Sequence, residues 1–142
     1  TVMLGLSGVD EGHTRPMTAY RDGDSGPLWF FTSTDTSLAK ETAEPRSAMA
    51  TFTSRGHDLY ACIHGRLRVD HNRAMVDRLW NRSVAAWFAQ GKDDPKLLLL
   101  CFEPHEAEIW EDASSLVAGL KLLLGSDPKA DFRDSVAKVN LA

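Results

Sequence analysis

The residues best suited to chemistry in this chain lie close together between positions 15 and 37. Arg15 opens an Arg-Pro-Met segment, an apolar aromatic segment follows at 28–33, and the oxygen-bearing side chains of Asp35, Thr36 and Ser37 come next. Arginine forms paired hydrogen bonds with phosphate oxygens, and aromatic side chains form the walls of pockets for flat ligands. The stretch therefore predicts a binding site for a cofactor that has a flat apolar ring system and a phosphate tail.

Hydrolytic and metal chemistry have little support elsewhere in the sequence. The five histidines lack the spacing of a metal site, and no Ser-His-Asp, Cys-His or paired-carboxylate arrangement stands out. Cys62 and Cys101 lie in apolar segments without a partner at a suitable spacing, so we expect two free buried thiols. We therefore expect no metal, and His64 is the one histidine whose surroundings could suit a ligand.

Length and composition indicate one domain. A chain of 142 residues with 43% hydrophobic content can bury one sizeable core. The net charge of -4 and the scattered Lys and Arg residues exclude a nucleic-acid partner. Because the sequence has neither an apolar run of about 20 residues nor a signal peptide, it predicts a cytoplasmic protein that does not bind membranes.

The hydrophobic pattern predicts a mainly antiparallel β-barrel with inserted helices. Apolar alternation or continuity typical of strands occurs in seven segments: 2–6, 15–20, 28–33, 47–53, 59–69, 97–102 and 106–111. The first two are joined by a turn around 8–12, and 28–33 is apolar enough to be buried on both faces. Most connections are too short for crossovers, which favours antiparallel pairing in a small closed barrel.

Three helices are expected between or after these strands. The first spans Ser37–Glu44 and ends at Pro45, the second is amphipathic over Arg73–Phe88 with Trp80 and Trp87 packed inward, and the third covers Ser114–Leu124. The barrel domain thus comprises 1–125, and 126–142 forms a loosely packed tail.

Two faces of the predicted strands carry unexpected aromatic residues. In 59–69 the odd positions are apolar and face the core, whereas the even positions include Tyr60, His64 and Arg66. That even face suits a subunit interface or a ligand wall, and a plain solvated face fits equally well. Trp110 shares its face with glutamates, so a large aromatic side chain lies where solvent would favour polar groups.

Seven short motifs give the chain a resemblance to a known family. They are Arg-Pro-Met from position 15, Trp-Phe-Phe-Thr-Ser from 29, Asp-x-Ser from 35, Leu-Trp-Asn from 79, Ala-Trp-Phe from 86, Asp-Asp-Pro from 93 and Glu-Ile-Trp from 108. In order and spacing they resemble the bacterial general stress protein family, part of the pyridoxamine 5'-phosphate oxidase-like group with the FMN-binding split β-barrel. The likeness runs from Thr1 to Leu124, and it implies a first helix upstream of Thr1.

The resemblance implies a flavin site, with FMN as the cofactor and FAD as the alternative. Arg15 resembles the arginine that grips the phosphate, Met17 the residue that lines the ring, and Ser37 the hydroxyl that contacts the phosphate. Phe31 and Thr32 resemble the pair beside the isoalloxazine and ribityl chain. The full implied cofactor-binding set is Arg15, Pro16, Met17, Phe31, Thr32, Ser33, Ser37, Leu38, Tyr60 and Trp110.

The resemblance also implies a homodimer with flavin sites at the subunit interface. Tyr60 takes the place where related oxidases put a glutamine of the second subunit, and Trp110 resembles a tryptophan that reaches the flavin across the dimer. This role would explain the exposed positions predicted for both side chains.

Leu38 departs from the family pattern, because many relatives have a lysine there as a second phosphate cation. Losing such a contact weakens phosphate binding by roughly 1.5–3 kcal/mol unless Lys40 or Arg46 replaces it. Leu38→Lys should therefore tighten FMN binding if the position faces the phosphate, and should destabilise the fold if it is buried. The C-terminal basic residues of true pyridoxamine phosphate oxidases have no match, which argues against vitamin B6 synthesis.

Three functions fit these observations. The first is a flavin-binding stress protein with weak oxidoreductase activity, in which the flavin performs the electron chemistry. The second is a flavin-binding or sensing module without turnover. The third is a haem-handling split-barrel protein, which would need an axial ligand such as His64.

Overall fold

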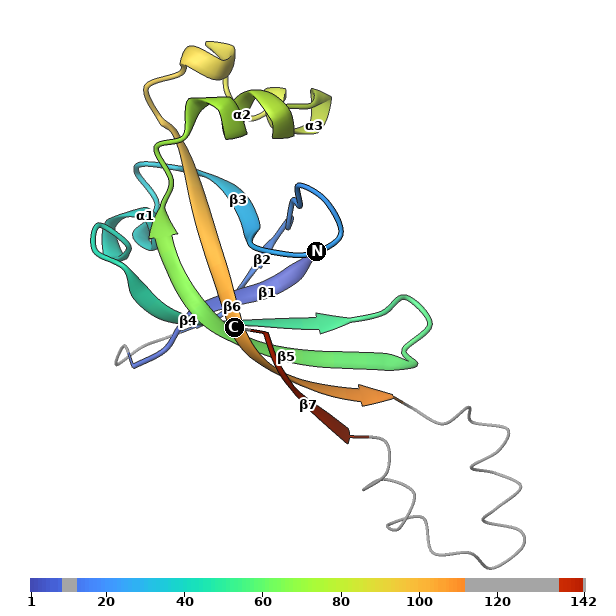
Figure 1. Cartoon of the computed structure of the whole chain (residues 1–142). Coiled ribbons are helices and arrows are strands. Elements are labelled where there is room, and N and C mark those ends of the chain that lie inside the picture. Colours follow the sequence, from blue (N-terminus) through green and yellow to red (C-terminus); the bar gives the residue numbers. More distant parts are fainter. Residues whose placement is uncertain (9–12, 112–135, 142) are drawn as a thin grey trace, which may run out of the picture.

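The computed structural model describes residues 1–8, 13–111 and 136–141 and is dominated by one antiparallel sheet (Figure 1). Its strands are β1 (Val2–Leu6), β2 (Arg15–Met17), β3 (Leu28–Ser33), β4 (Arg46–Thr53), β5 (Leu59–Val69), β6 (Leu97–Glu111) and β7 (Val136–Asn140). The helices are α1 (Ser37–Glu41), α2 (Arg73–Leu79), α3 (Arg82–Ala85) and the 3-10 helix η1 (Gly91–Asp93).

The sheet curls into a nearly closed barrel. Its order is β2-β1-β4-β5-β6-β3, and β7 pairs with the second half of β6. The two ends of this order meet beyond β2, where Tyr20 and Trp29 of β3 exchange two backbone hydrogen bonds of 2.9 Å. The predicted mainly β, antiparallel barrel is confirmed, because every named strand pair is antiparallel.

Alternate side chains along the strands point inward and fill the barrel interior. Leu4, Phe30, Leu67 and Phe102 are fully buried in one core cluster, and the odd face of β5 supplies its share through Leu67. A second cluster lies outside the barrel wall, where α2 packs on Trp29 and its neighbours. Adjacent residues of β3 therefore enter different clusters, as expected for a strand whose apolar side chains are buried on both faces.

β6 is one strand of 15 residues, so the prediction of two separate strands over 97–102 and 106–111 is wrong. The first half of β6 pairs with β3 and the second half pairs with β7. On its other edge, β6 pairs with β5 along most of its length. The two strands were predicted because the continuous apolar run ends at Phe102 and the alternating pattern begins only at Glu106. β6 continues through this point as a β-bulge: Gly65 of β5 pairs with Pro104 and His64 pairs with Glu106, which leaves His105 as the extra residue on β6.

The segment 73–88 forms two helices, which corrects the prediction of one continuous helix. Trp80 leaves helical geometry (φ -63°, ψ 131°), and the Asn81 side chain accepts hydrogen bonds from the N–H groups of Ser83 and Val84. An asparagine that caps a new helix competes with continuation of the old one. The predicted inward packing of Trp87 is also wrong, since this side chain is 85% exposed.

Several boundaries differ from the sequence-based expectation. α1 ends at Glu41 instead of Glu44, with Thr42 as its C-cap, and the Thr42 hydroxyl donates to the carbonyl oxygens of Leu38 and Ala39. β2 ends at Met17, and β7 lies in a segment for which the sequence predicted no strand. The predicted helix over 114–124 and most of the turn at 8–12 lie outside the described residues.

Candidate functional site

A pocket of about 380 Å³ opens between the β2–β3 side of the barrel and α3. Twelve described residues line it: Pro16, Met17, Thr18, Tyr20, Phe31, Thr32, Ser33, Thr36, Ser83, Val84, Trp87 and Phe88. Its size is within the ordinary range for small-molecule sites, and its lining combines aromatic and apolar groups with a few hydroxyls. Five residues of the predicted cofactor set are thus brought together: Pro16, Met17, Phe31, Thr32 and Ser33.

Arg15 and Ser37 meet beside this pocket, although 22 positions separate them. The Arg15 Nη1 donates a hydrogen bond of 3.0 Å to the Ser37 Oγ, which links β2 to the first residue of α1. The Arg15 Nε is buried and has no hydrogen-bond partner among the described residues. An unpaired buried donor on a cation costs free energy unless a ligand satisfies it. The two residues predicted to contact a phosphate therefore lie together, with a donor still to be satisfied.

A hydroxyl cluster continues from β3 into α1. The Thr36 Oγ1 donates to the Ser33 carbonyl oxygen (2.8 Å), accepts from the Ala39 N–H (3.2 Å) and lies 3.2 Å from the Thr32 Oγ1. Thr36 is the N-cap of α1, so the same hydroxyl begins the helix and fixes the end of β3. The cluster holds the polar wall of the pocket in one geometry and leaves acceptor oxygens for a polyhydroxyl chain.

An aromatic series forms the other wall. The Tyr20 and Phe31 rings meet edge to face with centroids 5.5 Å apart, and Phe31 meets Trp80 in the same way at 6.1 Å. Trp80 then lies 6.3 Å from Phe88. These spacings are typical of favourable aromatic pairs. Tyr20, Phe31 and Phe88 present one side to the pocket, so Trp80 supports the wall from behind.

Sequence reasoning missed the contribution of α3 and its following residues to the pocket. Ser83, Val84, Trp87 and Phe88 all line it, yet the pattern predicted only packing for this segment. The available signal was the Ala-Trp-Phe motif, which places two large aromatic residues next to each other in the sequence. Thr18 and Tyr20, just beyond β2, were also missed.

Leu38 has its side chain in the barrel core, where it is 1% exposed. Of the two outcomes stated above for this position, the buried one applies, and a lysine here would have to leave the core to reach a phosphate. The neighbouring cations Lys40 and Arg46 are exposed, and Arg46 donates to the Glu41 carbonyl oxygen (3.2 Å). Arg15 is therefore the cation whose geometry supports a phosphate at Ser37.

Tyr60 and Trp110 face each other directly across the β5–β6 ladder, and Tyr60 is 38% exposed. Neither lines the pocket of its own chain. Figure 1 shows why, since these ends of β5 and β6 extend away from the end of the barrel that α2 and α3 cover. The structure therefore separates these two residues from the rest of the predicted cofactor set within one chain.

The thiols and His64 also lie apart from the pocket. The Cys62 Sγ is 3.6 Å from the His64 Nε2 on β5, and burial, followed by the Glu108 carboxylate, raises the pKa of Cys62. Cys101 is buried, and burial raises its pKa to about 11. Within residues 1–8, 13–111 and 136–141, no group of three His, Cys, Asp or Glu side chains is arranged to hold a metal ion.

A carboxylate at the turn between β3 and α1 is held ionised. Hydrogen bonds from the Ser33 hydroxyl and then from Lys96 lower the pKa of Asp35, and the Lys96 Nζ lies 3.1 Å from Asp35 Oδ2. The pair is exposed and contributes little to stability. Because Asp35 pairs with Lys96, the positive charge of Arg15 near Ser37 belongs to a separate group.

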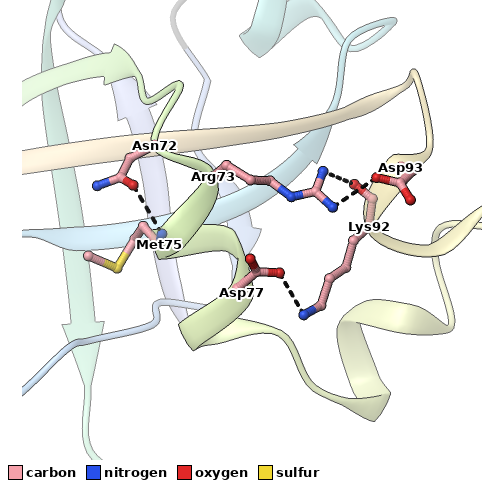
Figure 2. A network of polar contacts seen from close by, with 6 residues as sticks. All are labelled: Asn72, Arg73, Met75, Asp77, Lys92 and Asp93. Atoms are coloured by element: carbon pink, nitrogen blue, oxygen red, sulfur yellow. Dashed lines mark hydrogen bonds and ion pairs between the residues drawn. The ribbon is translucent and has the colours of Figure 1, made fainter.

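A set of polar contacts, here called the clamp, joins α2 to η1 and so closes the chain segment between them, which contains α3 (Figure 2). Arg73 donates to the Lys92 carbonyl oxygen (2.8 Å) and to Asp93 Oδ1 (2.8 Å), while the Lys92 Nζ donates to Asp77 Oδ1 (2.7 Å). The bond from Lys92 lowers the pKa of Asp77. Each exposed pair contributes little alone, but together the three contacts close the loop that carries α3.

Comparisons with known proteins place these features in context. Residues 1–126 match the family described as pyridoxamine 5'-phosphate oxidase like. The chain is similar to the general stress FMN/FAD binding protein of Xanthomonas citri, at 53% identity over 81% of this chain and 82% of that one, with a TM-score of 0.76. A general stress family protein of Xanthomonas campestris pv. campestris is 54% identical over 81% and 80%, also with a TM-score of 0.76. General stress protein 26 of Bacillus subtilis is 27% identical over 122 residues, or 82% and 85% of the two chains.

None of the described helices has the length and apolar character needed to cross a membrane.

Proposed function

The chain belongs to the pyridoxamine 5'-phosphate oxidase-like family, among its general stress proteins, and on this premise we propose that it binds FMN in the pocket between β3 and α3. The Xanthomonas citri relative, a general stress FMN/FAD binding protein at 53% identity, supports this choice of ligand. FAD is the alternative, because it shares the same ring and first phosphate.

The observation that carries the proposal is the buried, unpaired Nε of Arg15 beside Ser37. A phosphate at this edge of the guanidinium would accept from Nε and Nη2, which is the paired geometry that guanidinium prefers, while Nη1 keeps its hydrogen bond to Ser37. The Ser37 hydroxyl would then be free to donate to the same phosphate. Arg15 and Ser37 thus fit the phosphate end of the ligand.

The ring and ribityl chain fit the remaining walls. Thr32, Ser33 and Thr36 line the pocket, and their hydroxyls would bind the ribityl hydroxyls. Phe31 would lie against the ring. When bound, the flavin would supply one- and two-electron chemistry. The described lining offers hydroxyls and aromatic or apolar groups, so the chain's own residues would bind the flavin, orient it and exclude water.

We further propose a homodimer in which Tyr60 and Trp110 of one chain approach the flavin of its partner. Two facts support this arrangement. The two side chains form a cross-strand pair with an exposed tyrosine, and they lie outside the pocket of their own chain. A symmetric pair of barrels would bring the two aromatic residues of each chain to the other's pocket.

Oxidoreductase activity and flavin sequestration remain the two candidate roles of the bound flavin. The described lining contains no His, Cys, Asp, Glu or Lys, and electron transfer by a flavin requires none of them, so an activity assay decides between the two roles. Consumption of NAD(P)H with an electron acceptor by the flavin-loaded protein would support turnover. Its absence in a protein that binds flavin tightly would support sequestration.

A titration with FMN, FAD and riboflavin tests the proposed function. Flavin fluorescence or isothermal calorimetry should show saturable binding of FMN, with riboflavin bound at least about tenfold more weakly because it lacks the phosphate. An absorption spectrum of the purified protein would distinguish a flavin from a haem. The proposal is refuted if none of the three flavins binds at protein concentrations of about 100 μM.

A further inference from the structure

We infer that Trp87 is the residue that covers the ring of the bound flavin, acting as a stacking and positioning residue; this inference rests on the proposed function. The first observation is exposure. Trp87 is 85% exposed, whereas Trp29 is buried and both Trp80 and Trp110 are half-buried. A fully solvated indole is uncommon in a folded domain, because it leaves a large apolar surface in water.

The second observation is position. Trp87 follows α3 and lines the same pocket as Val84 and Phe88, which are both buried. The backbone N–H of Trp87 donates to the Val84 carbonyl oxygen at 3.0 Å, so the Trp87 backbone continues the turn of α3. The exposed indole therefore stands on the rim of the pocket, next to side chains that already form its wall.

The third observation is that polar contacts hold the backbone segment carrying Trp87, whereas its side chain is largely exposed. The clamp of Arg73, Lys92 and Asp93 closes the loop around α3, and Arg78 of α2 bonds Asp22 in the loop after β2 at 2.7 Å (Figure 2 shows the clamp). Among the residues that the structure describes, none covers most of this indole, which is 85% exposed. It can rotate onto a ligand without moving the helix.

These features suit one part of the ligand. A flat, electron-poor isoalloxazine ring stacks well on an indole, and closure of the indole over the ring would bury apolar surface on both. The phosphate lies at the other group of side chains, Arg15 and Ser37. The contribution of Trp87 should therefore come from stacking and should be independent of ionic strength, unlike that of Arg15.

The test compares FMN binding by the wild type with Trp87→Ala, Trp87→Phe and Gln90→Ala at low and high salt. Gln90 is exposed, near Trp87 and outside the pocket lining, so Gln90→Ala is the matched control. We expect Trp87→Ala to weaken binding about tenfold at both salt concentrations, Trp87→Phe to stay within about threefold of the wild type, and Gln90→Ala to bind normally. Melting temperatures of the free proteins should agree, because no buried group is removed.

The outcomes separate the two proposals. Equal FMN affinity of Trp87→Ala and the wild type would overturn the role of Trp87 and leave the proposed function standing. A loss that shrinks as salt rises would also overturn it, since stacking is not screened. Absence of FMN binding by the wild type would refute the proposed function itself.

Discussion

Leu38→Lys tests directly how the phosphate end of the pocket is built. Leu38 is 1% exposed in the barrel core, so its removal forfeits about 1.5–3 kcal/mol of apolar burial. The new ammonium group adds a desolvation cost of several kcal/mol if it stays inside, and less if its long stem carries it to the surface of α1. The expected loss is about 2–5 kcal/mol, a large part of the roughly 5–15 kcal/mol available to a small domain.

Urea unfolding followed by circular dichroism measures this loss, with Leu38→Met as the matched control. Methionine conserves the volume and apolar character of leucine, so its cost should stay below about 1.5 kcal/mol. FMN affinity, measured below the unfolding transition, should not improve in Leu38→Lys. An unfolding midpoint equal to that of the wild type, together with tighter FMN binding, would refute the placement of Leu38 in the core.

Three further outcomes are expected. Gly65→Ala should cost about 1–3 kcal/mol in thermal unfolding, since a Cβ there would lie 2.5 Å from the Glu103 carbonyl oxygen and 2.6 Å from the buried Phe102 ring; an unchanged melting temperature would contradict this close approach. Glu108→Gln should speed alkylation of Cys62 at pH 8, because removing the carboxylate lowers the thiol pKa and raises the thiolate fraction; a slower or equal rate would disprove the coupling. Light scattering at micromolar concentration should give twice the mass of one chain, and a monomer mass would exclude the dimer.

The strands and the core were largely predictable from local patterns. The alternation of 59–69 located β5 with its observed bounds, and the continuous apolar run of 28–33 located β3. Both signals depend only on which side chains avoid water, so they survive without knowledge of the tertiary fold. For the same reason Arg15 and Ser37 could be singled out by chemistry, although their contact of 3.0 Å depends on the barrel.

The remaining features depend on competition between local and tertiary terms. Asn81 ends one helix and begins another because its side chain satisfies two backbone donors, an outcome that apolar spacing does not report. The apolar pattern of 97–102 and that of 106–111 indicated two strands, but a β-bulge at His105 lets β6 continue as one. Trp87 and Phe88 share the same apolar character in the sequence, and only the packing of α3 shows that one is exposed and the other buried.

The central claim is that the Arg15–Ser37 pair binds the phosphate of a flavin held in the pocket beside it. The most direct test measures FMN and riboflavin affinities of the wild type and Arg15→Ala. Loss of a charge-assisted contact of about 1.5–3 kcal/mol predicts FMN binding weakened by roughly 10- to 150-fold, with riboflavin binding unchanged and the loss reduced at high salt. Equal FMN affinity of the two proteins, or an equal loss for both ligands, would contradict the account.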